Sequence, residues 1–330
     1  MNSFPDNKSF AFSIFDDTDL STADNVAPVY RLLSELGMRT TKSVWPLATV
    51  VEGKHGGCSL QDPEYLSFIL HLQDLGFEIA MHNMRNHHCS RELVQRGFAE
   101  FRRLVGQYPR AHANHSRNRE NLYWGAARFR FLKLLYALGA RFAGERSFEG
   151  HVPESESFWG DLCHDHLDYV RNFVFRGINL DRVNPTMPYH DPAKPLVKYW
   201  FSSCDGSDVE SFCNLLSRRN QERLERERGV CIVYTHFACG FVQNSAVDRR
   251  IELTLRALAK RNGWFVPVSE LLDHLRLQRQ SDRIPVTELA AMEAHWACDR
   301  VAIAFARAMR CRKLAASNPA VRSCSSALAS

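Results

Sequence analysis

The chain has 330 residues, 45% of them hydrophobic, and carries 42 basic against 37 acidic side chains. This composition suits a globular protein of one large domain or two ordinary ones, and a formal charge of +5 is too small to argue for a nucleic-acid partner. No window approaches the roughly 18 apolar residues of a membrane span, and MNSFPDNKSF has no secretory signal pattern. The ten cysteines contain no C-x-x-C pair, so we expect a cytoplasmic protein with reduced thiols.

Short apolar runs alternate with amphipathic stretches along most of the chain. Strands are expected at residues 10–15, 42–50, 77–81, 110–114, 197–203, 230–235 and 264–268, with a weaker one at 141–144. Helices are expected at residues 25–37, 62–76, 90–106, 245–263 and 269–278, and each of the first four ends at a glycine. This alternation is typical of parallel βα units and predicts an α/β fold, a (β/α) barrel of seven or eight strands.

Two regions fall outside the alternation. Residues 146–196 are rich in His, Pro, Asp and Asn and are interpreted as a long insertion or lid. A further helix is expected at 286–314. The chain is therefore divided into a barrel over 1–280, a helical extension over 281–317 and a tail over 318–330 that we expect to be disordered.

The first expected strand, FAFSIF, runs directly into three carboxylates, Asp16, Asp17 and Asp19. Like charges this close repel, so a positive partner is expected beside them. Polar residues also follow the other strands: His82, His112, Asn114, His115, Asp205 and His236. Sites in parallel α/β folds lie at the carboxyl ends of strands, and Asp and His suit Zn²⁺, Fe²⁺ or Co²⁺. The pattern predicts a divalent cation bound near Asp16 and Asp17, with Asp19 interpreted as a cap of the next helix.

Four segments resemble the polysaccharide deacetylase (NodB-homology, carbohydrate esterase family 4) superfamily. FSIFDDTD resembles its first motif, a strand ending in two aspartates, and LGFEIAMHNMRNHH resembles its second, a strand entering a histidine cluster. GVCIVYTHFACGF resembles its last motif, a strand ending in a histidine, and ALAKRNGWFVPVSELLDHL resembles its closing strand and helix. The resemblance covers residues 10 to about 275, and the order and spacing of the four segments carry it.

This resemblance implies a distorted (β/α) barrel and a metal-dependent hydrolase that removes an acyl group, usually acetyl, from an amino sugar or glycan. By motif position, Asp16 would be the general base and His236 the general acid. Asp17 and His82 would be ligands of the metal, with zinc expected and iron or cobalt as alternatives. The expected partner is a carbohydrate that carries an N-acetyl group.

The third ligand is ambiguous, because the position four residues after the first motif histidine is Asn86. His87 is the nearest replacement, provided that this segment is a loop, and His88, His112 and His115 remain alternatives. The usual Arg-Pro-Pro-Tyr third motif is replaced by RAHANHSRN. Substrate contacts are expected from this stretch, at His112, Asn114, His115 and Arg117.

Two other functions fit parts of the sequence. IFDDTDL resembles the first motif of haloacid dehalogenase phosphatases, with Asp17 and Asp19 at the right spacing. However, Ser21 stands at a position where that motif has threonine, and no late acidic pair follows. The second alternative is a non-catalytic carbohydrate-binding protein on the same barrel, which the broken histidine spacing favours.

Overall fold

The computed structural model describes residues 3–53, 55–115, 118–142 and 147–317. Arg117 and the tail expected over 318–330 lie outside these residues. The strands of the main sheet are β1 (Phe10–Asp16), β2 (Thr41–Val44), β3 (Glu78–Met81), β4 (Ala111–His112), β5 (Tyr169–Phe175), β6 (Tyr199–Asp205), β7 (Val230–Thr235) and β10 (Gly263–Phe265). A short hairpin is formed by β8 (Val242–Gln243) and β9 (Ala246–Val247).

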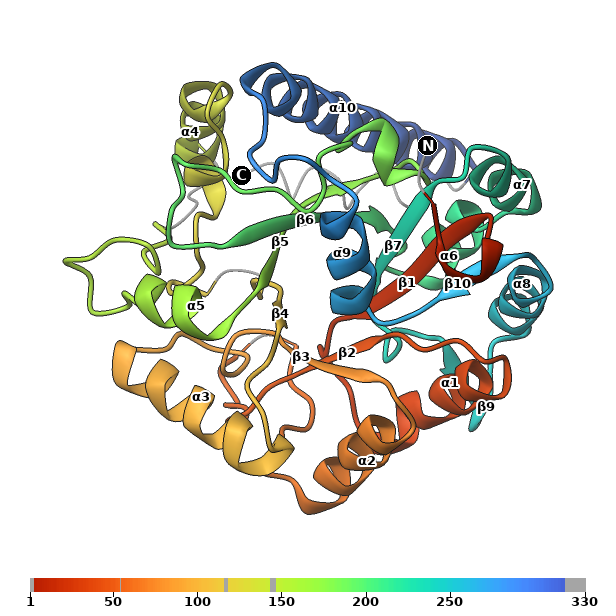
Figure 1. Cartoon of the computed structure of the whole chain (residues 1–330), viewed down its shortest axis with the longest axis horizontal. Helices are drawn as coiled ribbons and strands as arrows, with labels where there is room; N and C mark the ends of the chain where they lie inside the picture. The colour runs from red at the N-terminus through yellow and green to blue at the C-terminus, as the bar shows by residue number, and fades with distance from the viewer. Residues whose placement is uncertain (1–2, 54, 116–117, 143–146, 318–330) are drawn as a thin grey trace.

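The strands β1 to β7 close into a parallel barrel, with the seam at β1 (Figure 1). One edge of β1 pairs with β7 along most of its length, and the other edge pairs with two strands, β10 and β2. Its first half pairs with β10, at Phe10↔Gly263, and its end pairs with β2, at Asp16↔Lys42. The predicted α/β fold with a distorted barrel of seven or eight strands is therefore confirmed. All seven residues of β1 are buried, as expected of a central parallel strand.

Helices surround the barrel (Figure 1). They are α1 (Ala23–Glu35), α2 (Pro63–Asp74), α3 (Arg91–Val105), α4 (Lys133–Phe142), α5 (Gly160–His166), α6 (Val209–Leu215), α7 (Arg218–Arg226), α8 (Arg249–Ala259), α9 (Val268–Leu277) and α10 (Val286–Ser317), with 3-10 turns η1 (Pro5–Asn7), η2 (Gly125–Arg128) and η3 (Leu180–Arg182). The predicted glycine stops after α1, α2 and α3 all have positive φ: Gly37, Gly76 and Gly106. Gly263 instead begins β10, because α8 ends at Ala259. In the part of the chain that the structure describes, no helix has the length and apolarity needed to cross a bilayer.

One barrel strand lies where an insertion was expected. Within residues 146–196, β5 pairs with β4 on one side and with β6 on the other, so the barrel would not close without it. Its sequence, YVRNFVF, is aromatic and β-branched, but Arg171 and Asn172 interrupt the apolar run. Both polar side chains are buried. The weaker strand expected at 141–144 is wrong for Arg141 and Phe142, which form the last turn of α4, and its other two residues lie outside the described part of the chain.

Candidate metal centre

The three carboxylates after β1 are separated by their partners. Asp16 pairs with a lysine, Asp17 with an arginine, and Asp19 with histidines. The positive partner expected from the sequence is thus divided among three different groups. Each group comes from another strand or strand end, so the barrel closure itself brings the partners to β1.

Asp16 connects several elements of the barrel through its two carboxylate oxygens. Its Oδ2 lies 2.8 Å from Lys42 Nζ and accepts a hydrogen bond from Tyr30 Oη at 2.9 Å, while its Oδ1 accepts one from the backbone N–H of Phe237 at 2.8 Å. Asp16 and Lys42 are fully buried. Burial lowers the pKa of Lys42, but the carboxylates of Asp16 and Asp17 outweigh it and raise this pKa overall. Asp16 therefore joins β1, β2, α1 and the loop after β7.

Asp17 is held by a guanidinium from β5. Arg171 donates two parallel hydrogen bonds, from Nη1 to Oδ1 at 2.9 Å and from Nη2 to Oδ2 at 2.6 Å. The guanidinium carbon lies 4.5 Å from the ring centroid of Tyr234, which limits its orientation. Burial raises the pKa of Asp17, but the charge of Arg171 outweighs it and lowers this pKa overall. Asp17 Oδ2 lies 3.8 Å from His82 Nε2, next to the histidine cluster.

Asp19 lies among three histidines. Its Oδ1 is 2.9 Å from His115 Nε2, and its Oδ2 is 3.1 Å from His236 Nε2 and 3.7 Å from His82 Nε2. Burial raises the pKa of Asp19, but contacts with these histidines lower it overall. The interpretation of Asp19 as a helix cap is wrong, because Thr22 caps α1 through a capping box with Asn25.

Asp19, His82 and His115 could hold a divalent metal. Each residue offers one ligand atom, and the three atoms lie within 4.8 Å of one another. All three residues are buried. His82 comes from the end of β3 and His115 from the loop after β4, so the group forms at the carboxyl ends of adjacent strands.

Both histidine rings are oriented for ligation through Nε2. His82 Nδ1 lies 2.9 Å from the carbonyl oxygen of Ala113, to which only a protonated Nδ1 can donate. His115 Nδ1 lies 3.1 Å from Oδ1 of Asn118, whose amide donates to the backbone oxygens of Arg85 and His87 and so points Oδ1 at the ring. In these tautomers each Nε2 carries the lone pair that a metal requires.

The ligand atoms lack hydrogen-bond partners. Among the described residues, Asp19 Oδ1, His82 Nε2 and His115 Nε2 are buried and make no hydrogen bond. The Asp19 and His115 atoms are close, but their geometry is not that of a hydrogen bond. A buried polar atom without a partner is costly, and three that converge on one point fit a bound cation.

His236 lies at the edge of this group. Its Nε2 contacts Asp19 and also lies 3.3 Å from Tyr234 Oη, while its Nδ1 lies 3.1 Å from the carbonyl oxygen of Ser207. Burial lowers the pKa of His236, but contact with Asp19 and the charge of Asp17 raise it to about 9. At 15% its side chain is more exposed than that of Asp19, His82 or His115.

The remaining expected site residues have other surroundings. His87 packs against His88, with ring centroids 4.8 Å apart and the rings tilted by 50°, and it is not part of the group of Asp19, His82 and His115. The amide of Asn114 is engaged by the backbone of Leu122 through both its ends. His112 is fully buried against Trp159, and burial lowers its pKa to about 3.

Asn86 is held by the backbone of another loop. It occupies the position where the resemblance implies a histidine, and its side-chain amide bonds both the N–H and the C=O of Val50. It thus fixes the loop after β2 in place of binding a metal. His115, expected as a substrate contact or an alternative ligand, lies beside His82 with ring centroids 5.1 Å apart.

No protein-family model and no curated protein matches the sequence. Among solved structures, a protein assigned as a polysaccharide deacetylase from Mycobacterium smegmatis matches with a TM-score of 0.52 and 13% identity, over 86% of this chain and 96% of that chain. A peptidoglycan deacetylase from Bacillus subtilis matches with a TM-score of 0.41 and 11% identity, over 84% and 96%. A family 4 acetyl xylan esterase from Clostridium thermocellum, in complex with cobalt, matches with a TM-score of 0.39 and 13% identity, over 84% and 100%.

The chain has the fold of a polysaccharide deacetylase. At 13% identity this likeness concerns the path of the backbone. The functional side chains must therefore be judged on the geometry of this deacetylase-like barrel itself. Arg171 is the member of the site that the sequence did not reveal, and its signal was an arginine within the strand-like run YVRNFVF.

Proposed function

We propose that the protein is a metal-dependent hydrolase that removes an acyl group, in particular acetyl, from the nitrogen of an amino sugar. The observation that carries the proposal is the group of three buried, unsatisfied ligand atoms of Asp19, His82 and His115. One carboxylate and two imidazoles suit Zn²⁺, Fe²⁺ or Co²⁺. When bound there, such a cation would polarise the acyl oxygen and stabilise the negative charge that develops on it.

We infer that Asp17 is the general base. Asp17 borders the ligand group, and Arg171 holds its carboxylate ionised and in a fixed orientation. Asp16, the base implied by the motif order, instead contacts Lys42 and Tyr30 through Oδ2 and the backbone N–H of Phe237 through Oδ1. Asp17 would accept the proton of the attacking water, so that a hydroxide equivalent forms at the acyl carbon.

His236 fits the role of general acid. Its Nδ1 is oriented by the carbonyl oxygen of Ser207, and its Nε2 lies 3.1 Å from Oδ2 of Asp19, a member of the ligand group. It would donate a proton to the nitrogen of the leaving amine as the carbon–nitrogen bond breaks. The proton taken up by Asp17 and the proton given by His236 balance the hydrolysis.

Metal analysis combined with deacetylation assays tests the proposal. The purified protein should contain about one divalent metal per chain and release acetate from N-acetylhexosamine substrates. Asp19→Ala should lose the metal and the activity, whereas His87→Ala, the matched control outside the ligand group, should keep both. Absence of stoichiometric metal after reconstitution would favour the non-catalytic carbohydrate-binding alternative, and metal loss in His87→Ala would contradict the ligand set.

A further inference from the structure

Helix α4 exposes an apolar stripe. The stripe consists of Phe131, Leu134, Leu135, Leu138 and Phe142, which are 48%, 80%, 70%, 61% and 91% exposed. Within the helix, Leu135, Leu138 and Phe142 follow Leu134 by one, four and eight residues, which puts them on one face, and Phe131 lies just before the helix begins. None of the residues of α4 is buried in the body of the protein. An amphipathic helix gains most of its stability by packing its apolar face against other apolar groups, and the apolar face of α4 is exposed to solvent.

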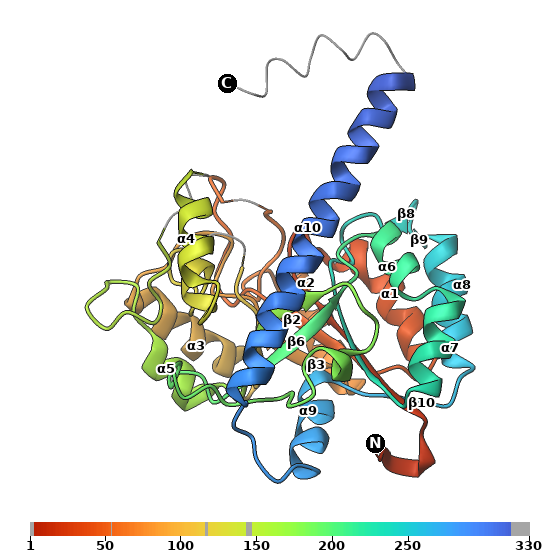
Figure 2. The ribbon, with the colours of Figure 1, turned by 90° about the horizontal axis from the view of Figure 1, so that it is seen from above.

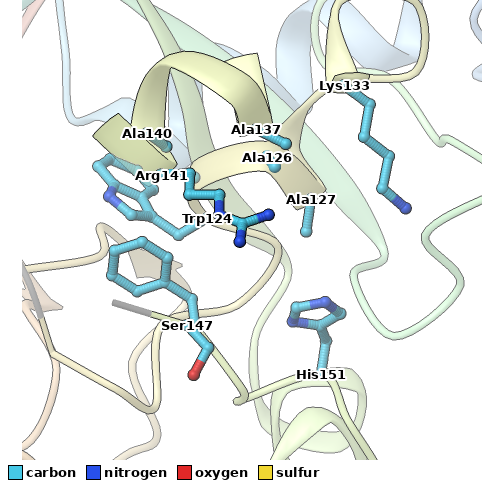
Figure 3. A pocket seen from close by; sticks show the side chains of 11 residues that line it. Trp124, Ala126, Ala127, Lys133, Ala137, Ala140, Arg141, Ser147 and His151 are labelled. Carbon is cyan, nitrogen blue, oxygen red and sulfur yellow. The ribbon is translucent and has the colours of Figure 1, made fainter. Parts of the chain in front are cut away.

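The stripe faces away from the barrel because the other face of α4 is the attached one. Glu293 of α10 accepts hydrogen bonds from the N–H groups of Arg130, Phe131 and Leu132, just before the helix begins. Tyr136 packs with Phe129 and Trp296. The inner side also borders a cavity of about 460 Å³, and the α4 residues that line it are Lys133, Ala137, Ala140 and Arg141 (Figure 3).

The surroundings of the stripe are basic. Residues 124–142 contain four basic and no acidic side chains: Arg128, Arg130, Lys133 and Arg141. Arg130, Lys133 and Arg141 are exposed. On α10, Val301 and Phe305 are also apolar and exposed, at 70% and 68%. Figure 2 shows α4 and this part of α10 on the side of the barrel opposite the N-terminus, where β8 and β9 also lie.

We propose that the α4 stripe, together with Val301 and Phe305 of α10, docks onto the surface of a bilayer rich in anionic phospholipid. An apolar face flanked by Lys and Arg is the pattern of helices that lie in a membrane interface. Charge complementarity favours this occupant over a second copy of the chain, because a symmetric dimer would bring the two basic faces together. The inference does not depend on the proposed hydrolysis.

Vesicle co-sedimentation of the full chain tests this proposal. The protein should bind vesicles of phosphatidylcholine mixed with phosphatidylglycerol, and binding should weaken as salt is raised. The double substitution Leu134→Ser with Leu138→Ser should weaken binding about tenfold or more. Each substitution removes about half of the free energy gained when a leucine side chain is fully buried in an apolar environment. Hydrogen exchange of residues 131–142 should slow on anionic vesicles in the wild type.

The matched control is Leu277→Ser, which changes a leucine that is 83% exposed. This leucine ends α9, a helix on the side of the barrel where the chain's N-terminus lies (Figure 2). It should bind vesicles like the wild type. Equal binding by the wild type and the Leu134/Leu138 variant, or no binding by the wild type, would overturn the proposal. So would a dimer, measured by sedimentation without lipid, that the same two substitutions dissociate.

Discussion

At the scale of single residues, the site depends on how neighbours divide one acidic cluster. Asp16 and Asp17 are adjacent, yet Lys42 neutralises the first and Arg171 the second. Removing either carboxylate leaves a buried cation unpaired, which costs on the order of 3–5 kcal/mol of unfolding free energy. Stability therefore cannot distinguish the two residues, but turnover can, because only Asp17 borders the ligand atoms.

We accordingly expect Asp17→Asn to lower kcat by about 10² to 10⁴ while metal content is kept. Asp16→Asn should change kcat of the folded protein by less than about tenfold, since its partners are structural. Kinetics on samples shown to be folded by circular dichroism measure the difference. A larger loss of kcat in Asp16→Asn than in Asp17→Asn would contradict this assignment. It would instead support Asp16 as the general base, as the motif order implies.

Stability at acid pH should depend on His112. The pKa of this buried histidine is about 3, below the ordinary value of 6.5, because burial disfavours the imidazolium. Below about pH 6.5 the unfolded chain binds a proton that the folded chain refuses, so folding stability falls as the pH falls toward 3. The shift limits this contribution to a few kcal/mol.

His112→Gln should therefore flatten the pH dependence. The variant loses packing against Trp159 at neutral pH, but its unfolding free energy should decline less steeply than that of the wild type between pH 6 and pH 4. Urea unfolding at a series of pH values measures both slopes. Parallel curves would show that His112 does not carry the effect.

The sequence predicted the histidines of the site better than the roles of its aspartates. His82, His115 and His236 were recognisable because each follows an apolar run, and strand ends converge in a parallel barrel. The division of roles among Asp16, Asp17 and Asp19 was not recognisable, because it depends on which cation lies beside each carboxylate. Those cations, Lys42 and Arg171, are 26 and 155 positions from Asp16 in the chain.

At the scale of elements, β5 is the strand that completes both barrel and site. Period and composition predicted the other strands of the barrel, but Arg171 and Asn172 inside YVRNFVF resembled an interruption. In the structure Arg171 donates the paired hydrogen bonds to Asp17, which directly follows β1, so the interruption links β5 to the end of β1. A barrel interior can accept a buried arginine where another strand supplies its carboxylate.

A double-mutant cycle measures this link between β5 and β1. Arg171→Met alone should destabilise the fold by about 3–5 kcal/mol, because Asp17 is left as an unpaired buried charge. Combining it with Asp17→Asn should cost less than the sum of the single changes, with an interaction energy of roughly 1–3 kcal/mol. Additivity within about 0.5 kcal/mol in chemical denaturation would mean that the pair is not coupled.

At the scale of the whole molecule, α10 connects the C-terminal region to the segment between β4 and β5. Glu293 is fully buried and accepts three backbone hydrogen bonds at residues 130–132, while Trp296 packs on Phe129 and Phe173. Sequence periodicity predicted the helix but not its partner, because no local pattern states which distant N–H groups a buried glutamate will accept. The helical extension thus belongs to the packing of the barrel's outer layer.

Removing the Glu293 carboxylate should therefore loosen α4 without disturbing the metal centre. Glu293→Ala leaves three N–H groups without their acceptor, at a cost of about 1–3 kcal/mol each where they stay buried, so local opening around residues 130–142 becomes the cheaper response. We expect faster hydrogen exchange and faster proteolysis in this segment, with metal content unchanged. Asp299→Ala is the matched control on the same helix, because Asp299 accepts from the N–H of Arg176 instead. Equal opening of residues 130–142 in both variants, or loss of metal in Glu293→Ala, would contradict the prediction. Either result would mean that the substitution destabilises the barrel as a whole.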